Sequence, residues 1–382
     1  ERTFDGLSTG AEEKKMGIKS SSTRQVIFDN VKVPVENLLG EVGQGAKIAF
    51  NILNTGRFKL GAGCVGGAKD TLAIAAKYAQ ERVQFGVPIA SFGLIQEKLG
   101  EIALRIYAVE SAVYRTAGLI DEAIGGNKAP AHQLKCIEEY ATECSIIKVM
   151  GSELLDFAAD EGLQIHGGYG YSQDYEIERI YRDSRINRIY EGTNEINRIL
   201  IPEMLVKRSQ RGELPLLDAA KKLSLNLAGL TAEKEPEISS TLATQQNAIR
   251  HSRNIILLLL GSAGQVLGDR LRQEQEVVAR LANMIMVTYA GESALLRTLK
   301  LQNRGEDVQL QEAMTQAYIE SALAQIRQWA LEATARYLQG DVLKEFQEVV
   351  ATLTQTTTVN TIQLRRQIAE AVLKANGYPV DY

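Results

Sequence analysis

The spacing of hydrophobic residues differs between parts of the chain, and in the first part it is typical of short β-strands. Between residues 1 and 40 they fall in brief β-rich runs, Val26–Phe28 and Val31–Val33, with turn-forming residues between them. Pro34 stops the second run because proline cannot donate to a strand ladder. The glycine-rich segment Gly40–Gly45 then marks a boundary. We therefore predict the end of a β domain over residues 1–40.

Beyond this boundary the apolar residues recur every three or four positions, which is the spacing of one helix face. Three such segments follow one another: Gly61–Val83, Ile95–Val113 and Ile137–Ala158. Small residues on the third, such as Gly151, predict close approach of a neighbouring helix. A glycine-rich break at Gly162–Asp174 precedes a fourth helix that starts near Thr193. These segments predict a four-helix bundle over residues 46–212.

A second helical region follows the linker Gly212–Pro215, and a polar entry around Pro236 leads into it. The apolar spacing predicts helices at four places: 241–268, 272–302, 308–339 and 341–352. None of them shows a spacing of polar residues typical of a catalytic site. The predicted fold class is therefore mainly α, with an extra α-helical domain over residues 213–382 after the bundle.

The composition argues against some classes of function, such as nucleic-acid binding and metal binding, but it does not identify the function. Hydrophobic residues make up 45% and charged residues 24% of the chain, as in ordinary globular proteins. The net charge of −4 gives no overall attraction to nucleic acid, so no nucleic-acid partner is expected. The histidines and cysteines do not cluster at metal-ligand spacing, so no metal site is expected. We expect the three cysteines to be buried, reduced thiols: Cys64, Cys136 and Cys144.

The longest apolar run, Ile255–Leu260, is far shorter than the ~20 residues that span a bilayer, so a soluble protein is expected. Packing inside the helical region is one interpretation of the segment Ile255–Leu267. A peripheral membrane contact through the same segment is the alternative. The sequence leaves both open.

The segment Arg188–Glu195, RIYEGTNE, places one carboxylate between an aromatic residue and a glycine. A carboxylate just before a helix is favoured by the helix dipole alone, which is one interpretation of Glu191. The other is catalytic, because Tyr190 and Gly192 allow Glu191 to pack against apolar surface and still be approached closely by a ligand. Thr193 can cap the following helix, whose free amides suit a polar or anionic group.

Two neighbouring patterns are ambiguous in the same way. Arg182, Arg185 and Arg188 recur every third residue, which fits either solvated charges or the binding of a phosphate-rich ligand. The stretch Gln164–Tyr171, QIHGGYGY, fits the end of a helix with glycine after its last turn. Its glycines can also let backbone amides approach phosphates.

Five segments occur together in one order: Glu13–Gly45, Asn54–Phe58, Glu81–Ile89, Gln164–Tyr171 and Arg188–Ile196. With this combination the chain resembles the acyl-CoA dehydrogenases. The resemblance runs from about residue 1 to 205 and continues more weakly to the end. The long extra helical region is similar to that of the very-long-chain branch. The resemblance implies the fold of that family's C-terminal four-helix bundle, with a partial β domain before it and an extra α-helical domain after it.

The resemblance also implies a role for individual residues. Glu191 matches the catalytic base, and Gly56 occupies the position that carries the base in some relatives, so Glu191 is the only candidate here. The positions matching substrate contacts are Asn54, Arg57, Tyr190 and Gly192. The positions matching flavin contacts are Thr193, Asn194 and Glu195. Those matching contacts to the FAD of a neighbouring subunit are Arg82, Gln84, Gln164, Gly167 and Gly168.

The implied activity is the FAD-dependent dehydrogenation of long-chain acyl-CoA thioesters to trans-2-enoyl-CoA in fatty acid β-oxidation. A base takes the α-proton, FAD accepts the β-hydride, and the Glu191 backbone N–H and a flavin hydroxyl stabilise the charge on the thioester oxygen. The implied partners are an acyl-CoA substrate, electron-transfer flavoprotein and a second copy in a homodimer. We expect a cytoplasmic protein in a bacterium, or one of the mitochondrial matrix or inner membrane in a eukaryote.

Two departures from the family pattern keep other functions open. Relatives usually carry glutamine where this chain has Phe92 and Gly93. The family's N-terminal helical domain and the first part of its β domain are not in the sequence, so we expect the C-terminal portion of such an enzyme. A catalytically incomplete fragment that acts as an assembly scaffold is one alternative. An acyl-CoA oxidase that uses oxygen directly is the other.

Overall fold

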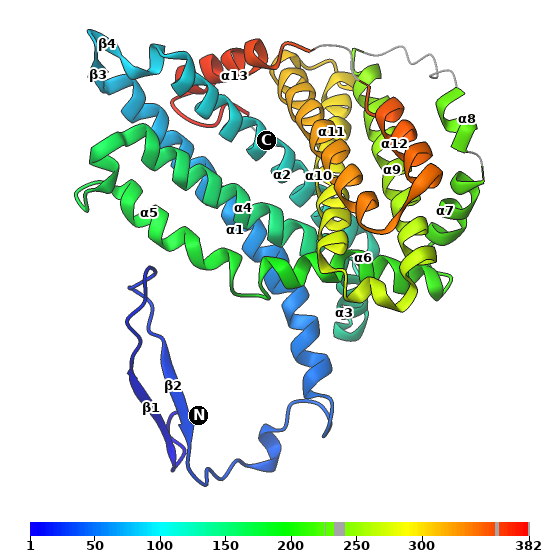
Figure 1. Cartoon of the computed structure of the whole chain (residues 1–382). Coiled ribbons are helices and arrows are strands. Elements are labelled where there is room, and N and C mark those ends of the chain that lie inside the picture. The colour runs from blue at the N-terminus through cyan, green and yellow to red at the C-terminus, as the bar shows by residue number, and fades with distance from the viewer. Residues whose placement is uncertain (226, 233–240, 356–358, 381–382) are drawn as a thin grey trace.

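The computed structural model describes residues 1–225, 227–232, 241–355 and 359–380, and most of them are helical (Figure 1). The strands are β1 (Leu7–Glu12), β2 (Arg24–Phe28), β3 (Val83–Gln84) and β4 (Val87–Pro88). The helices up to the linker are α1 (Gly45–Glu81), α2 (Gly93–Ile124), α3 (Pro130–Glu139), α4 (Ala141–His166), α5 (Glu176–Ser184) and α6 (Asn194–Gln210). Those after it are α7 (Leu216–Ser224), α8 (Leu227–Ala232), α9 (Ala243–Leu267), α10 (Gln275–Asn303), α11 (Gln309–Tyr337), α12 (Gly340–Leu353) and α13 (Thr361–Ala375).

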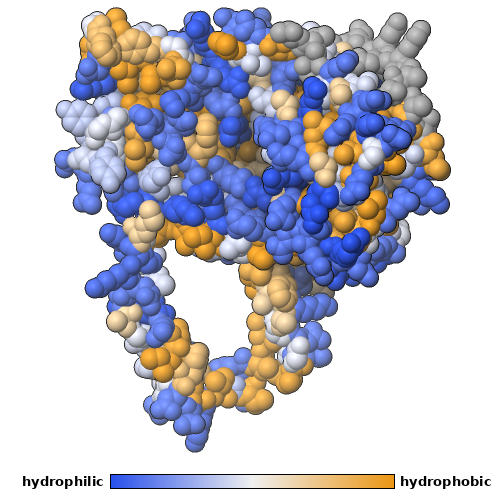
Figure 2. All heavy atoms as spheres, viewed as in Figure 1, coloured by the Kyte–Doolittle hydropathy of each residue, from blue (hydrophilic) through white to orange (hydrophobic). Residues whose placement is uncertain are grey.

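The N-terminal hairpin stands apart from the helical body (Figure 1). β1 and β2 pair antiparallel, with Leu7 opposite Phe28. The strand expected at Val31–Val33 is wrong, because this segment joins no ladder in the described chain. Apolar side chains lie exposed on the hairpin and on the segment leading into α1, as Figure 2 shows. The hairpin touches α5 where Arg182 donates to the Met16 carbonyl oxygen at 3.1 Å.

The predicted bundle helices are present, with two changes of boundary. α1 begins at Gly45, well before the expected Gly61. The third predicted segment is two helices, because Tyr140 leaves helical geometry between α3 and α4 and so separates Ile137 from the rest. α1 packs against α4 and α2, and α6 packs against α4. The approach predicted from small residues is confirmed, since a Cβ added at Gly151 would lie 2.6 Å from the carbonyl oxygen of Gly61.

Helices α9 to α12 match the four predicted ones within a few residues, whereas α7, α8 and α13 were not predicted. Asn360 caps the start of α13, because its Oδ1 accepts from the Gln363 backbone N–H at 3.0 Å, and α13 packs on α2 and α11. The polar entry expected around Pro236 lies outside the described residues. Ile255, Leu259 and their neighbours in α9 are buried in a cluster with α10, α11 and α12, which supports the first of the two interpretations of this segment, internal packing. None of the helices among the described residues has the length and apolar character needed to cross a membrane.

One hydrophobic core joins the bundle to the C-terminal helices. It contains Leu72 of α1, Ile106 of α2, Ile319 of α11 and Ile368 of α13, each at most 2% exposed. α2 lies at the centre, because it contacts α1 and α4 on one side and α10, α11 and α13 on the other. The helices before and after the linker therefore stabilise each other. The three cysteines are buried, as predicted.

Candidate active site

A tight turn before α6 positions the predicted base. A short 3₁₀ helix, Arg185–Arg188, ends just before it, and Thr193 caps α6 by accepting from the Ile196 backbone N–H at 3.4 Å. Between these elements Glu191 has a φ of 59° and Gly192 a φ of 80°. A left-handed conformation costs a residue with a side chain on the order of 1 kcal/mol. Glu191 is therefore held in this conformation by its surroundings.

Two side chains from different helices hold the turn. Asn197 of α6 donates from Nδ2 to the carbonyl oxygens of Gly192 at 2.8 Å and Thr193 at 3.1 Å. Arg57 of α1 donates from Nε to the Glu191 carbonyl oxygen at 3.3 Å. Asn54, one turn earlier on α1, accepts from the Arg57 guanidinium at 3.4 Å. The turn is thus fixed through its backbone, and the Glu191 side chain is left for other contacts.

The Glu191 carboxylate faces the backbone of Gly56. A Cβ added at Gly56 would lie 2.6 Å from Oε2 and 2.9 Å from Oε1, so only glycine leaves room for the carboxylate. Oε2 is buried and has no hydrogen-bond partner. Burial lowers the pKa of the adjacent Arg57, although the Glu191 charge opposes this shift. A buried carboxylate oxygen with a free lone pair can accept a proton from a bound molecule.

The residues that flank Glu191 differ in where their side chains point. Tyr190 is 43% exposed and its hydroxyl donates to Asn187 at 2.7 Å. Glu195 is exposed, and a hydrogen bond to its own backbone N–H lowers its pKa. Asn194 is 2% exposed and turns into the protein, away from solvent.

Asn194 meets a buried lysine. Its Oδ1 accepts from Lys148 Nζ at 2.7 Å, and its Nδ2 donates to Ser152 at 3.1 Å and Glu153 at 3.0 Å. Lys148 is fully buried in α4, and burial lowers its pKa to about 8. The amide group of Asn194 is therefore committed to partners within the protein, and only its backbone remains for a ligand.

A second group of predicted residues converges at the other end of α1. A cleft there is lined by Tyr78, Arg82, Gln84, Ile89, Ile165, His166, Gly167, Gly168 and Tyr169. A Cβ at Gly167 or Gly168 would meet no atom within 4 Å, so their backbone is accessible. The cleft therefore combines a guanidinium, an amide and bare backbone, a set suited to an anionic ligand. Gln164 is exposed on the last turn of α4 and is not among the lining residues.

An aromatic cluster supports this cleft. The His166 ring stacks on Tyr78 with centroids 4.0 Å apart, and its Nδ1 pairs with the Gly162 carbonyl oxygen at 2.7 Å. Burial lowers the pKa of His166 and so favours the neutral ring. The Arg82 guanidinium lies 5.1 Å from the centre of the Tyr169 ring, within range of a cation–π contact.

Two arginines of the row, Arg182 and Arg188, form ion pairs within the protein, whereas Nη1 of Arg185 is buried without a hydrogen-bond partner. Arg182 pairs with Glu178 on its own helix, with its Nε 2.5 Å from Oε1. Arg188 pairs with Asp156 of α4 at 3.2 Å. These two guanidiniums are already matched with carboxylates, which weakens the interpretation of the row as a phosphate site.

Sequence reasoning missed the residues that support the turn. Asn197 was not predicted, because an asparagine in a helix can have many roles. Its position four residues after the Thr193 cap was the feature that could have indicated a contact with the turn. Lys148 had a clearer sequence signal, because it is a single lysine between Ile147 and Val149 in an apolar stretch. A charge at such a position has to find a partner inside the fold.

Comparisons with known proteins agree on one family. A sequence family described as acyl-CoA dehydrogenase, C-terminal domain, matches residues 43–206, and a second family with the same description matches residues 251–351. A probable acyl-CoA dehydrogenase of Bacillus subtilis (strain 168) is 46% identical over 100% of this chain and 65% of its own length. The mitochondrial very long-chain specific acyl-CoA dehydrogenase of Rattus norvegicus is 44% identical over 53% of this chain and 29% of its own.

A solved structure matches the whole described fold. The acyl-CoA dehydrogenase from Bacillus anthracis, solved in complex with FAD, superposes with a TM-score of 0.96 at 44% identity. The match covers 100% of this chain and 66% of that one. This chain therefore spans about two thirds of the length of these two Bacillus relatives.

Proposed function

The chain belongs to the acyl-CoA dehydrogenase family, and from this we propose that it dehydrogenates acyl-CoA thioesters with FAD, using Glu191 as the base. The observation that carries the proposal is the Glu191 carboxylate itself. Its Oε2 is buried without a hydrogen-bond partner, and the carboxylate lies in the space that a Cβ at Gly56 would otherwise take. Such an oxygen is suited to receive the proton from the carbon next to the thioester.

Several residues of the chain have separate roles in the removal of this proton. Glu191 receives the α-proton, and the carbon–hydrogen electron pair moves toward the thioester carbonyl. Negative charge then grows on the carbonyl oxygen, and a fixed backbone N–H such as that of Glu191 stabilises it. Arg57 and Asn197 hold the turn, so that both groups keep their positions while the charge develops.

The cleft at the far end of α1 fits part of FAD. Gly167 and Gly168 leave the backbone open, and Arg82 and Gln84 add a cation and an amide, as a pyrophosphate-bearing group requires. Bound FAD would supply the acceptor for the β-hydride. Arg57 and Arg82 lie ~38 Å apart along α1 at the usual helical rise. We therefore propose that the two sets of residues serve different cofactor molecules in a homodimer, each of them contacted by both subunits.

Two finer parts of the proposal concern substrate and electron acceptor. We propose long-chain acyl groups as substrates, supported by the likeness to very long-chain specific relatives. We propose electron-transfer flavoprotein as the acceptor. A series of butanoyl-, octanoyl- and palmitoyl-CoA tests the first part, with kcat/KM expected to rise along the series. A flat or falling series would contradict it.

The base is tested by anaerobic mixing of the FAD-reconstituted protein with acyl-CoA, followed by loss of flavin absorbance. We expect Glu191→Gln to slow this loss at least about 100-fold, because it removes the proton acceptor while keeping the shape. Glu213→Gln, at an exposed ion pair with Arg208, is the matched control and should behave like the unaltered protein. A Glu191→Gln protein that loses absorbance at the control rate would overturn the assignment.

The same samples separate the other two functions. A protein that shows no flavin absorbance after addition of FAD would favour a scaffold. Hydrogen peroxide formed in air at the rate of substrate loss, without electron-transfer flavoprotein, would favour an oxidase. Rapid turnover only when electron-transfer flavoprotein is added supports the dehydrogenase.

A further inference from the structure

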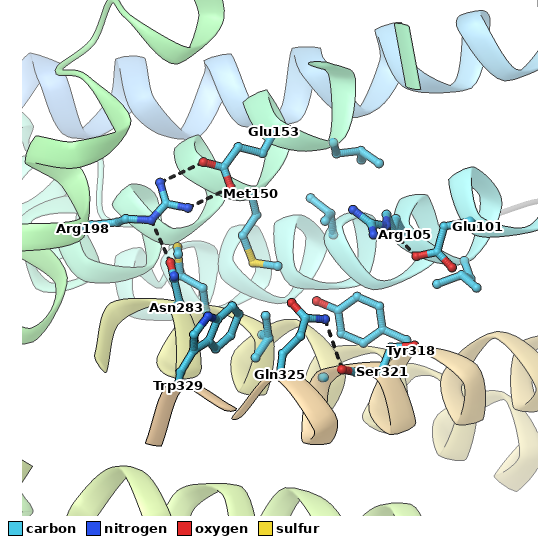
Figure 3. Close-up of a pocket in the computed structure, with 16 residues that line it drawn as sticks. Glu101, Arg105, Met150, Glu153, Arg198, Asn283, Tyr318, Ser321, Gln325 and Trp329 are labelled. Carbon is cyan, nitrogen blue, oxygen red and sulfur yellow. Dashed lines mark hydrogen bonds and ion pairs between the residues drawn. The ribbon is translucent and has the colours of Figure 1, made fainter. Parts of the chain in front are cut away.

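A continuous set of polar contacts runs from α10 to the start of α6, along one wall of a pocket between the bundle and the C-terminal helices (Figure 3). Asn283 of α10 accepts from Arg198 Nε at 2.7 Å. The two terminal nitrogens of Arg198 reach Glu153 of α4, at 2.8 Å to Oε1 and 2.9 Å to Oε2. Figure 3 shows Arg198 lying between these two partners. The same Oε1 accepts from Asn194 Nδ2 at 3.0 Å.

The far end of this set lies close to the catalytic turn. Asn194 follows the Thr193 cap and stands three positions after Glu191. Its amide is also held by Lys148 and Ser152, so its side chain has little freedom. Glu153 is thus one of three side chains of α4 that hold Asn194 at the point where the turn enters α6.

We propose that Asn283 and Glu153 are positioning residues, through which α10 sets the placement of the Glu191 turn. The inference rests on the proposed function of Glu191 as the base. A two-pronged arginine–carboxylate contact is directional, so it transmits orientation as well as proximity. Proton removal is sensitive to such placement, because a displacement of about 1 Å can cost two orders of magnitude in rate. The C-terminal helices then contribute to catalysis without touching the substrate.

Two variants of Asn283 test the role of its contact with Arg198. Asn283→Leu removes the acceptor for Arg198 at similar size. Asn283→Asp keeps an oxygen at the same place and should restore the contact. Gln325→Leu is the matched control, because Gln325 lines the same pocket and its amide donates to the Ser321 carbonyl oxygen on its own helix, at 3.1 Å.

The first readout is steady-state turnover of acyl-CoA. For Asn283→Leu we expect kcat to fall about tenfold with KM changed less than about threefold, because the base is misplaced while the binding contacts remain. Asn283→Asp and Gln325→Leu should keep the unaltered kcat. An unaltered kcat in Asn283→Leu, or an equal loss in Gln325→Leu, would overturn the proposal.

The second readout does not depend on the proposed reaction. Amide hydrogen exchange over residues 189–195 should become at least about fivefold faster in Asn283→Leu and return to normal in Asn283→Asp. If the unaltered protein turns over no acyl-CoA, the proposed function fails and exchange still decides the positioning role. Unchanged exchange in Asn283→Leu sinks that role. If Asn283→Leu does not fold, Glu153→Gln replaces it, because glutamine keeps an acceptor for Asn194 but weakens the contact with Arg198. Unchanged exchange over residues 189–195 in Glu153→Gln would also contradict the positioning role.

Discussion

At the scale of single residues, the site depends on a glycine, Gly56, because this residue has no side chain. Gly56 is helical and needs no unusual backbone conformation, so its absent Cβ matters only for the space that it leaves. That space is filled by the Glu191 carboxylate from a turn far along the chain. Glycine weakens a helix by up to about 1 kcal/mol relative to alanine. The chain thus carries a small cost in stability at the place where the base lies.

Alanine at position 56 should therefore separate activity from stability. We expect Gly56→Ala to lower kcat at least about tenfold, because the new Cβ displaces the carboxylate. Gly63→Ala is the matched control, since it lies on the same helix and its Cβ would meet no atom within 4 Å. Both variants should unfold at the same or a higher denaturant concentration than the unaltered protein. Full turnover by Gly56→Ala would show that the carboxylate does not lie there during the reaction.

Buried Lys148 gives the molecule a predicted pH dependence. Burial lowers its pKa from 10.5 to about 8, opposed by the charges of Cys64, Glu153 and Glu195 and assisted by that of Arg57. Between these two pH values the unfolded chain keeps a proton that the folded chain has released. The free energy of unfolding therefore gains a term that rises with pH through this window, by at most about 3 kcal/mol.

The variant Lys148→Met removes this titration while keeping a long side chain. Denaturant unfolding at several pH values from 7 to 10.5 should show a smaller gain in stability, or a steeper loss, for Lys148→Met than for the unaltered protein. Parallel curves for the two proteins would mean that Lys148 keeps its ordinary pKa in the fold.

How far the sequence predicts these residues depends on how local their role is. Glu191, Gly192 and Thr193 lie in one short motif, and the structure places that motif at a turn and helix cap. Asn197 and Lys148 act through contacts that only the assembled helices create. Asn194 shows the limit most clearly, because its motif suggests a ligand contact while its side chain is held by α4.

At the scale of elements, the crossing of α1 and α4 brings two backbones into contact. A Cβ at Gly151 would lie 2.6 Å from the Gly61 carbonyl oxygen and 2.7 Å from its Cα. Backbone atoms cannot give way as the end of a long side chain can. The close crossing sets the distance between the helix that carries Arg57 and the helix that carries Lys148, and so the space in which the turn lies.

Gly151→Ala should consequently destabilise the fold by about 1–3 kcal/mol, the usual cost of inserting a methyl group into packed structure. Gly66→Ala serves as the control, because its Cβ on α1 would meet no atom within 4 Å. Urea unfolding followed by far-UV circular dichroism measures both. Equal midpoints for the two variants would show that the helices can separate without cost.

Periodicity predicts helices better than it predicts their ends. The long helices of both regions lie where apolar residues recur at helical spacing. The break at Tyr140 was missed because the apolar pattern continues through it. α13 was missed although Asn360 and the spacing of Leu364, Ile368 and Val372 are its ordinary signals.

At the scale of the whole molecule, the helices before and after the linker share a hydrophobic core. The linker-like segment Gly212–Pro215 and the helical region after it favoured a separate C-terminal domain, and nothing in the sequence shows that α13 returns to pack on α2. Such contacts join residues far apart in the chain, so they follow from the assembled fold. The polar contacts from Asn283 to Asn194 run across the same junction.

The proposed chemistry comes down to the removal of one proton, which can be measured without hydride transfer. An acyl-CoA thioester with sulfur in place of its β-carbon can lose its α-proton but cannot be dehydrogenated. In D₂O, with FAD-reconstituted protein, mass spectrometry of this compound reports α-exchange alone. We expect rapid deuterium uptake with the unaltered protein and at least about 100-fold slower uptake with Glu191→Gln. Uptake at the same rate in both proteins would contradict the assignment of Glu191 as the base.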